Sequence, residues 1–302
     1  IEKDLLDAVL YAPDNTPGNK TLFSKSVART LLAKIYAEKP LRDYTKVIQY
    51  CDEVKADGFD LVDDFSDLFG MNAAGTDAKM RNTKESILEA QFTSGAGNWC
   101  TWMFGRDLVN WNNNFTWAKW VTPSRDLISA FKQEGDEVRF KESIVYYDCN
   151  WSNYYPSDNY PFMYKCRSAN SSIIKYRYAD VLLLKAEALI MQDTPDLEGA
   201  ADIIDEVRDR AKLGALPTSV RSNKNAMLNA LLKERRLELA FEGQRWFDLV
   251  RLDKVEEVMN AVYAKDSGRK AQIYTFDKNS YRLPIPQSVI DANDKIHQNP
   301  GY

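Results

Sequence analysis

Residues 234–251 read ERRLELAFEGQRWFDLVR, and this stretch carries more information about the fold than any other part of the chain. Leu237, Ala240 and Phe241 recur at helical spacing, which predicts a helix with one buried face. Gly243 then ends or breaks that helix, and a second apolar face begins at Trp246. The sequence therefore predicts two helices that meet at a tight corner.

Acidic residues line the first of these helices. Glu234, Glu238 and Glu242 stand four residues apart, so they form a column of like charge that an isolated helix would resist. Cations must therefore lie beside the column, and the candidates are Arg235, Arg236, Arg245 and Arg251, with Arg208 and Arg210 from another helix. We interpret the stretch as a structural ion-pair lattice that locks helices together, formed by Glu234, Arg235, Glu238, Glu242, Arg245, Asp248 and Arg251.

A catalytic or metal-binding use of the same carboxylates is the alternative interpretation. Calcium and zinc sites add Asn, His, Cys or backbone carbonyls at defined spacings, and the sequence has none of those spacings here. Motifs of zinc proteases, serine hydrolases, P-loops and dinucleotide-binding folds are also absent from the sequence. The sequence therefore predicts no metal, no cofactor and no catalytic residue.

Three ordered segments resemble the SusD/RagB family of nutrient-capturing outer-membrane lipoproteins. The first is the stretch 234–251, which looks like a signature of that family. The second, IKYRYADVLLLKAEALI at residues 174–190, is similar to the family's RYADVLL-x-x-AEAL helix. The third, RLPIPQSVIDANDKIHQNPGY at residues 282–302, matches its P-I-P to Q-N-P-G-Y ending. Together with residues 31–36 and 86–92, the resemblance spans nearly the whole chain in the expected order.

The resemblance implies a function, a partner and a location. It implies a non-catalytic binder of oligosaccharides or other nutrients, lipid-anchored on the outer face of the outer membrane, that docks on a TonB-dependent, SusC-like transporter. Family members carry a lipidated Cys and a further helical segment before the point that matches Ile1, so this chain is expected to correspond to roughly the C-terminal two thirds of one. A peptide binder or a docking module without a glycan site is the alternative.

Composition narrows the choice of partners. Charged residues make up 28% of the 302-residue chain and its net charge is only −4, so neither a basic nucleic-acid surface nor an acidic disordered tail is indicated. The sequence has no apolar run of about 18 residues, which is the length that a membrane-spanning helix needs. We therefore expect membrane attachment only through a lipid anchor outside this sequence.

A pattern of helix, proline, helix occurs twice, over residues 24–58 around Pro40 and over residues 178–213 around Pro195. Helical pairs of about 34 residues with small residues at the crossing resemble the tetratricopeptide design. Residues 225–241 and 245–259 are expected to form a third pair, because stacked pairs of this kind bury a shared core. The predicted fold is mainly α, with tetratricopeptide-like helical pairs, a long aromatic loop excursion and short strands.

Three regions are expected within one integrated domain. Residues 1–59 form a first helical repeat region, residues 60–172 the loop-rich aromatic excursion, and residues 173–302 further helical repeats and a C-terminal strap. Within the excursion, residues 86–92 favour a short strand and residues 126–131 a short helix. Loops longer than about 15 residues in a compact protein tend to be functional, so the excursion is the expected place of a ligand site.

The excursion holds six of the seven tryptophans. Sugar rings present apolar C–H faces and hydroxyl groups, so a sugar binder combines aromatic plates with planar amides that form hydrogen bonds. The predicted ligand-binding residues are Trp99, Trp102, Trp111, Asn112, Asn113, Trp151, Asn153, Tyr154 and Tyr155. An equally weighted alternative is that the tryptophans pack as the core of the long loops.

Two smaller expectations concern acids and cysteines. A helical glycoside hydrolase would need two carboxylates about 5 to 9 Å apart, and Asp136, Glu137 and Asp158 lie in the right region without forming a distinguished pair. Cys51 is predicted to be a buried thiol in an amphipathic helix, whereas Cys149 and Cys166 flank an aromatic loop and could pair.

Overall fold

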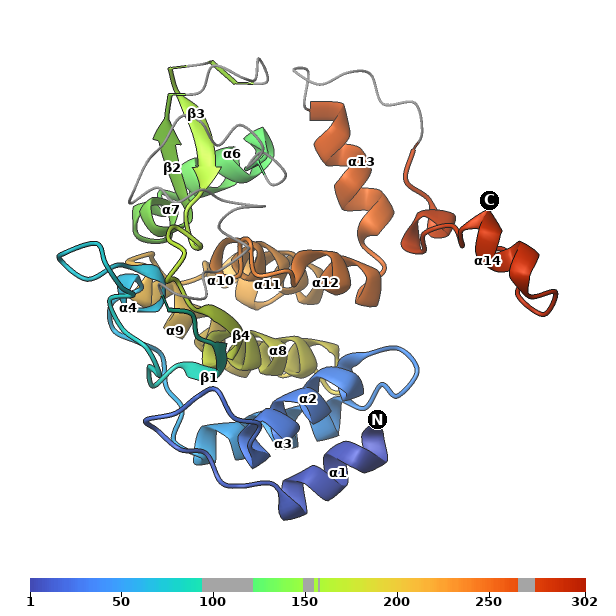
Figure 1. Ribbon diagram of the computed structural model, residues 1–302, viewed down its shortest axis with the longest axis horizontal. Coiled ribbons are helices and arrows are strands. Elements are labelled where there is room, and N and C mark those ends of the chain that lie inside the picture. The colour runs from blue at the N-terminus through green and yellow to red at the C-terminus, as the bar shows by residue number, and fades with distance from the viewer. Residues whose placement is uncertain (94–121, 149–154, 157, 266–274) are drawn as a thin grey trace. The chain divides into compact units, whose positions relative to one another are not determined.

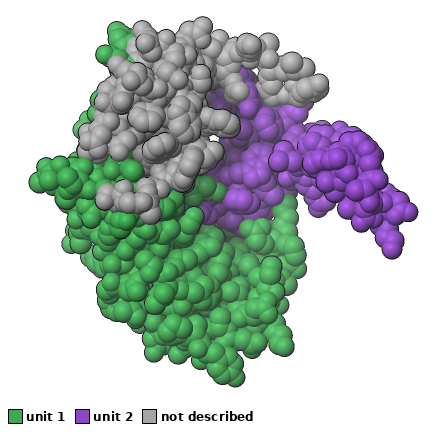
Figure 2. All heavy atoms as spheres, viewed as in Figure 1, with its two compact units in different colours: residues 1–243 green, residues 244–302 purple. Residues whose placement is uncertain are grey.

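The described residues contain stacked helical pairs, as the sequence predicts (Figure 1). The computed structural model describes residues 1–93, 122–148, 155–156, 158–265 and 275–302. These fall into two compact units, residues 1–243 and residues 244–302, which are coloured separately in Figure 2. The fold is mainly α with short strands, so the predicted fold class is confirmed.

The first unit begins with α1 (Glu2–Tyr11) and the pair α2 (Lys25–Ala37) and α3 (Tyr44–Ala56). A second pair, α8 (Tyr178–Met191) and α9 (Leu197–Arg210), packs against the first, since α3 lies on α8. The short α10 (Thr218–Arg221) and the longer α11 (Lys224–Glu238) follow, and α11 also packs on α8. Two pairs separated by more than a hundred residues of sequence therefore lie side by side.

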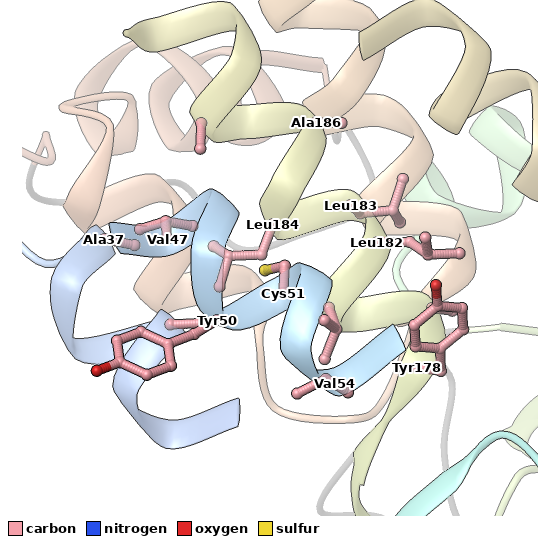
Figure 3. Packing of buried hydrophobic residues seen from close by; sticks show 14 of the residues in the cluster. Ala37, Val47, Tyr50, Cys51, Val54, Tyr178, Leu182, Leu183, Leu184 and Ala186 are labelled. Atoms are coloured by element: carbon pink, nitrogen blue, oxygen red, sulfur yellow. The ribbon is translucent and has the colours of Figure 1, made fainter. Parts of the chain in front are cut away.

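Small side chains allow these helices to approach closely. Ala28, Ala33, Ala186, Ala200 and Ala201 are all fully buried where α2, α8 and α9 pack together. Larger apolar residues fill the space around them, and Figure 3 shows the α3 and α8 side chains interleaving. Burial of this continuous apolar surface stabilises the stacked pairs.

Helix starts follow the capping rules. The side chain of Asp43 accepts a hydrogen bond from the backbone N–H of Lys46 at 3.1 Å, which caps α3. Asp196 caps α9 through the N–H of Gly199 at 2.9 Å. Asn223 caps α11 in the same way. Each cap supplies an acceptor to an N–H group that the helix itself leaves unpaired.

The described part of the excursion contains short strands and helices. The strand β1 (Ser86–Ala90) pairs antiparallel with β4 (Ile173–Arg177), and β2 (Ile144–Tyr147) pairs antiparallel with β3 (Tyr160–Met163). The helices are α4 (Ser66–Phe69), α6 (Arg125–Glu134) and α7 (Glu137–Ser143). The strand and the helix expected at residues 86–92 and 126–131 are therefore present as β1 and α6.

The corner after α11 differs from the prediction. The helix ends at Glu238, five residues before Gly243. The chain then turns through two left-handed residues, Phe241 at φ 65° and Gly243 at φ 78°. Glycine adopts this conformation without steric cost, whereas phenylalanine does so rarely. The turn therefore starts before Gly243, and Gly243 is the second of its two left-handed residues.

The second unit contains α12 (Arg245–Arg251), α13 (Val255–Lys265), η1 (Lys278–Tyr281) and α14 (Gln287–Ala292). The single helix predicted for residues 245–259 is wrong, because Asp253 adopts φ 56° and separates α12 from α13. Within this unit the Asn260 amide bonds both backbone groups of Phe276 at 2.9 Å, and Tyr263 stacks on the Phe276 ring. These contacts attach the C-terminal segment to α13.

Candidate functional site

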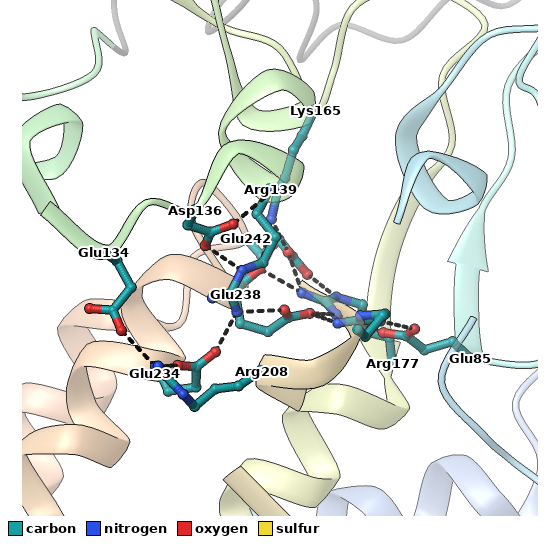
Figure 4. A network of polar contacts seen from close by, with 11 residues as sticks. Glu85, Glu134, Asp136, Arg139, Lys165, Arg177, Arg208, Glu234, Glu238 and Glu242 are labelled. Carbon is teal, nitrogen blue, oxygen red and sulfur yellow. Dashed lines mark hydrogen bonds and ion pairs between the residues drawn. The ribbon is translucent and has the colours of Figure 1, made fainter. Parts of the chain in front are cut away.

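The carboxylate of Glu238 lies at the centre of a buried ionic network (Figure 4). Arg177 contacts it at 2.5 Å from β4, Arg139 at 3.0 Å from α7, and Arg210 reaches it from α9. Its side chain has 0% of its surface exposed. Guanidinium groups hold carboxylates in fixed geometry, so this one residue connects three elements to α11.

The other two acids of the column extend the network at either end. Glu234 pairs with Arg139 at 2.5 Å and with Arg208 at 3.3 Å. Glu242 accepts two hydrogen bonds from Arg177, at 2.7 and 2.8 Å, and one from Lys165 at 2.6 Å. All three glutamates therefore have cationic partners within the first unit.

Two of the arginines nearest in sequence pair with carboxylates outside the column. Arg235 pairs with Asp180 at 2.7 Å and Arg236 with Asp126 at 2.6 Å. In the second unit Arg251 pairs with Asp248 at 2.9 Å, and Arg245 begins α12. Arg208 and Arg210, expected from another helix, do face the column, while Arg139, Lys165 and Arg177 were not foreseen. The sequence placed Arg177 beside the YADVLL helix, which was the available signal.

Electrostatics keep the carboxylates of Glu238 and Glu242 ionised. Burial by itself raises the pKa of the Glu238 carboxyl, but attraction to Arg210, Arg177 and Arg139 holds that pKa well below its usual value. Burial acts in the same way on Glu242, and attraction to Arg177 lowers its pKa. Buried carboxylates that are fully paired have no proton to donate and no free edge for a ligand. The ion pairs of these buried carboxylates therefore support the interpretation of a structural lattice.

A separate open pocket of about 480 Å³ lies between α6 and the β2–β3 strand pair. One face of α6 forms one wall. It presents Arg125, Ile128, Ser129, Lys132 and Gln133, at the i, i+3, i+4, i+7, i+8 spacing of a single helix side. Tyr146 of β2 and the segment with Tyr155, Pro156 and Asn159 form the rest of the described lining. The opposite face of α6 is apolar and packs against α11, which fixes the position of the wall.

Contacts on three sides hold Tyr155 in place. Its hydroxyl donates to the Pro123 carbonyl at 2.7 Å, and its ring meets Tyr160 edge-on at 5.6 Å between centroids. The guanidinium of Arg125 lies over the ring, 4.7 Å from its centroid. Tyr155 is therefore a preorganised aromatic element of the pocket.

Polar groups with unused hydrogen-bonding capacity surround this ring. Tyr146 is half-buried, burial raises the pKa of its phenol, and its hydroxyl has no hydrogen-bond partner among the described residues. Asn159 is exposed. Gln133 uses one N–H on the Ser129 hydroxyl at 3.1 Å, which leaves its other amide groups available. The pocket thus combines aromatic surface with hydroxyl and amide groups.

Only one of the predicted ligand-binding residues falls on this site. Tyr155 lines the pocket. The other eight, Trp99, Trp102, Trp111, Asn112, Asn113, Trp151, Asn153 and Tyr154, lie outside the described residues. Sequence reasoning missed Arg125, which lies one residue before the short helix predicted at residues 126–131, and it missed Tyr146. The aromatic composition of the excursion was the signal for Tyr146.

The remaining candidate features are metal ligands, membrane-spanning helices and cysteines. They contain no group of three or more His, Cys, Asp or Glu side chains placed to hold a metal ion. None of their helices has both the length and the apolar character required to cross a membrane. Cys51 is buried in α3, and burial raises the pKa of its thiol. Cys166 is also buried, whereas Cys149, its predicted partner, lies outside these ranges.

Known proteins share both sequence and fold with this chain. A model of the SusD family matches residues 159–302. SusD-like protein P38 of Formosa agariphila is 42% identical over 99 residues, which are 31% of this chain and 19% of that protein. SusD-like protein P2 of the same organism is 35% identical over 143 residues, or 45% of this chain and 27% of that protein. The matched segments therefore span far less than two thirds of either relative.

Solved structures extend the similarity to the whole chain. A laminarin-binding SusD-like protein is 25% identical and aligns with a TM-score of 0.69 over 100% of this chain and 68% of its own. Surface glycan-binding protein A from Bacteroides thetaiotaomicron, in complex with laminarihexaose, is 18% identical and aligns with a TM-score of 0.74 over 99% of this chain and 69% of its own. The fold is thus that of the helical SusD-like proteins. The sequence match over residues 159–302 and the shared fold together support a member of the SusD/RagB family.

Proposed function

We propose that this chain is the ligand-binding part of a non-catalytic surface protein that captures an oligosaccharide and passes it to a TonB-dependent outer-membrane transporter. The pocket beside Tyr155 carries the proposal, because it joins two tyrosines to hydroxyl and amide groups on a fixed framework. A sugar ring can place its C–H face on the aromatic surface and its hydroxyls on the polar groups. Relatives of the same fold bind laminarin and laminarihexaose, which supports a glycan as the ligand.

The eight predicted residues outside the described ranges remain part of this proposal as further ligand contacts. An open pocket of this kind offers a few aromatic and hydrogen-bonding contacts to solvent-exposed sugar. Binding is therefore expected in the micromolar to millimolar range, or about −4 to −8 kcal/mol. A protein that hands its ligand to a transporter needs such weak binding, since the ligand must also leave.

A direct test is affinity electrophoresis or calorimetry of this chain against soluble plant, host and microbial polysaccharides. We expect at least one glycan to bind, and Tyr155→Ala and Asn159→Ala to weaken that binding. Asn159 is exposed, so its variant should keep the wild-type melting temperature even if Tyr155→Ala perturbs packing. Tyr11→Ala is the matched control, because Tyr11 is 83% exposed on α1 and does not line the pocket. Unchanged binding in both pocket variants would refute the assignment of the site.

A glycoside hydrolase is the rival function. Asp136 is buried and its carboxylate bonds Arg139 at 2.6 Å, while Glu137 and Asp158 are exposed, and none of the three lines the pocket. A hydrolase needs two carboxylates about 5 to 9 Å apart across a bound sugar. We therefore expect no sugar release from any glycan that binds. Turnover that disappears in Glu137→Gln or Asp158→Asn would support the hydrolase instead.

The resemblance to the SusD/RagB family supports the proposed transporter partner and the proposed location. Outer-membrane extracts in mild detergent should yield the native protein together with a TonB-dependent transporter. Protease added to intact cells should degrade the protein if it faces outward. Recovery without any transporter, or complete protection from protease, would argue for a peptide binder or another kind of docking module elsewhere in the cell.

A further inference from the structure

A second pocket, of about 250 Å³, lies at one end of the β1–β4 strand pair. Ala90 pairs with Ile173 at this end, which brings the segment after β1 close to the turn before β4. The loop between α4 and β1 adds a third wall, and the described lining includes Thr76, Asp77, Arg81, Gln91, Phe92 and Asn170. None of these residues lines the pocket beside Tyr155, so the two pockets are separate.

Arg81 joins the three segments around this second pocket. Its Nη2 contacts Asp77 Oδ1 at 2.5 Å and the backbone carbonyls of Phe92 and Asn170, both at 2.8 Å. Its Nη1 donates to the Ser172 hydroxyl at 2.9 Å. Charged hydrogen bonds of this kind fix geometry, and the Asp77 carboxylate balances the charge of the guanidinium. The walls are therefore held in place without making the pocket a cationic site.

Hydrogen bonds also fix the orientation of two amides in the lining. Gln91 Nε2 donates to Asn82 Oδ1 at 2.7 Å and to Glu89 Oε2 at 3.0 Å. Because both partners are acceptors, the amide nitrogen must face them and the oxygen Oε1 must point away from them. Asn170 Nδ2 donates to the Thr76 carbonyl at 2.7 Å, which orients its amide in the same way.

The oxygens that remain in the lining are acceptors without donors. Gln91 Oε1 and Asp77 Oδ2 have no hydrogen-bond partner among the described residues, and Asn170 Oδ1 is buried without one. The hydrogen bond from Arg81 lowers the pKa of the Asp77 carboxyl, so this group stays ionised and can only accept. Acceptors left without donors are unfavourable, and a ligand rich in O–H groups would supply the donors.

We propose that this pocket is a second glycan subsite, which takes one neutral sugar unit through its hydroxyl groups. Phe92 offers aromatic surface to the C–H face of the sugar, while the Asp77 and Gln91 oxygens accept from its hydroxyls. Pockets for drug-sized ligands measure about 300 to 1,000 Å³, so a volume of about 250 Å³ suits a single unit. Since Arg81 already balances Asp77, the pocket does not require a cationic ligand. This subsite is additional to the site in the proposed function.

An NMR titration of the isotope-labelled chain tests the subsite. The probes are the methyl glycosides of glucose, galactose, mannose and xylose, at up to about 100 mM, which exceeds a millimolar dissociation constant. We expect at least one glycoside to shift the side-chain amide signals of Gln91 and Asn170 in a saturable way. The same shifts should persist in Asn159→Ala, which alters only the other pocket. No saturable shift at either amide with any of the glycosides would overturn the proposal.

Two variants tie the binding to this pocket. Asp77→Asn should weaken it about ten-fold, because Arg81 and the Ala78 N–H hold an oxygen at the Oδ1 position and place the new NH₂ where the sugar needs an acceptor. Phe92→Ala should weaken it by a similar factor, since it removes the aromatic surface. Asp52→Asn is the matched control, because Asp52 is also in an ion pair, is 51% exposed against 54% for Asp77, and does not line the pocket.

The side chain of Asp77 is exposed, so Asp77→Asn should keep the wild-type melting temperature even if Phe92→Ala perturbs packing. Unchanged affinity in Asp77→Asn would overturn the proposal, as would an equal loss in the Asp52→Asn control. Saturable shifts with glucosamine or calcium chloride, but with no neutral glycoside, would show a cation site and would also overturn it.

The outcomes separate this inference from the function proposed above. Glycan binding that depends on Tyr155 and Asn159, with no glycoside response at Gln91 or Asn170, would overturn the second subsite alone. A glycoside response at Gln91 and Asn170 that Asp77→Asn weakens would support the second subsite. It would do so even if the Tyr155 and Asn159 variants bound every polysaccharide as the wild type does, a result that would refute only the first site.

Discussion

Arg177 and Glu242 form a two-pronged ion pair, with Nε donating to Oε2 at 2.7 Å and Nη2 donating to Oε1 at 2.8 Å. Arg177 is the last residue of β4, and Glu242 lies 65 residues further along the chain, in the corner after α11. Parallel hydrogen bonds between charged groups are strong and directional. The pair therefore attaches that corner to β4, next to the start of α8.

Glu238→Ala should destabilise the fold by about 3 to 5 kcal/mol, because it leaves buried Arg177, Arg139 and Arg210 without their shared carboxylate. Urea denaturation monitored by circular dichroism measures the change. Glu198→Ala is the control, since Glu198 is 70% exposed and its pair with Arg221 should contribute less than about 1 kcal/mol. A wild-type denaturation midpoint for Glu238→Ala would show that the lattice contributes no stability.

Acid should weaken the fold through the same carboxylates. The pKa values of Glu238 and Glu242 are lower in the folded chain than their usual 4.5, so the unfolded chain binds more protons as the pH falls. Their contribution to stability is present above pH 4.5 and is lost as the pH falls through the folded pKa values. Urea midpoints measured from neutral to acid pH should decline below that point. Glu242→Gln should flatten the decline, and an unchanged slope would assign acid sensitivity to other groups.

Ala186→Leu should destabilise the first unit by about 1 to 3 kcal/mol, because Ala186 in α8 has 0% exposure and the close helix crossing leaves no room for a larger side chain. Thermal melting and urea denaturation both report the effect. Ala56→Leu, at the exposed end of α3, makes the same chemical change without crowding and should be nearly neutral. Equal stability of the two variants would contradict close packing at the crossing.

Cys51 should resist alkylation in the folded protein. Its thiol is buried, and burial raises its pKa, so almost no reactive thiolate is exposed near neutral pH. Mass spectrometry of the Cys51 peptide after iodoacetamide treatment measures the reaction. The same peptide should be modified rapidly in urea, which serves as the internal control. Rapid modification without denaturant would mean that α3 opens readily.

Tyr146→Phe should weaken glycan binding about two- to ten-fold while leaving stability unchanged, because it removes only a hydroxyl that has no partner in the described structure. Calorimetry against the best-binding glycan gives the change in affinity. Tyr11→Phe removes an equivalent hydroxyl far along the chain on exposed α1 and should have no effect. Wild-type affinity of Tyr146→Phe would place the sugar hydroxyls elsewhere in the pocket.

Sequence patterns among neighbouring residues were sufficient to predict much of the architecture. The prolines at residues 40 and 195 and the apolar spacing on either side predicted the pairs α2–α3 and α8–α9, and the structure contains both. Helical periodicity and turn residues act over a few positions, so sequence can report them. The same reasoning failed at Asp253, where a residue other than glycine takes the left-handed conformation that ends a helix.

The cationic partners of the buried glutamates could not be predicted from neighbouring residues in the sequence. The sequence alone determined that Glu234, Glu238 and Glu242 form a column needing cations and that helical pairs stack in the fold, and it predicts a ligand site in the aromatic excursion. Tertiary structure decided that Arg139, 95 residues away from Glu234, neutralises the column, and that α6 and Tyr146 join Tyr155 in one pocket. Helix periodicity depends on near neighbours, whereas ion pairs and pockets depend on which distant segments the packed core brings together.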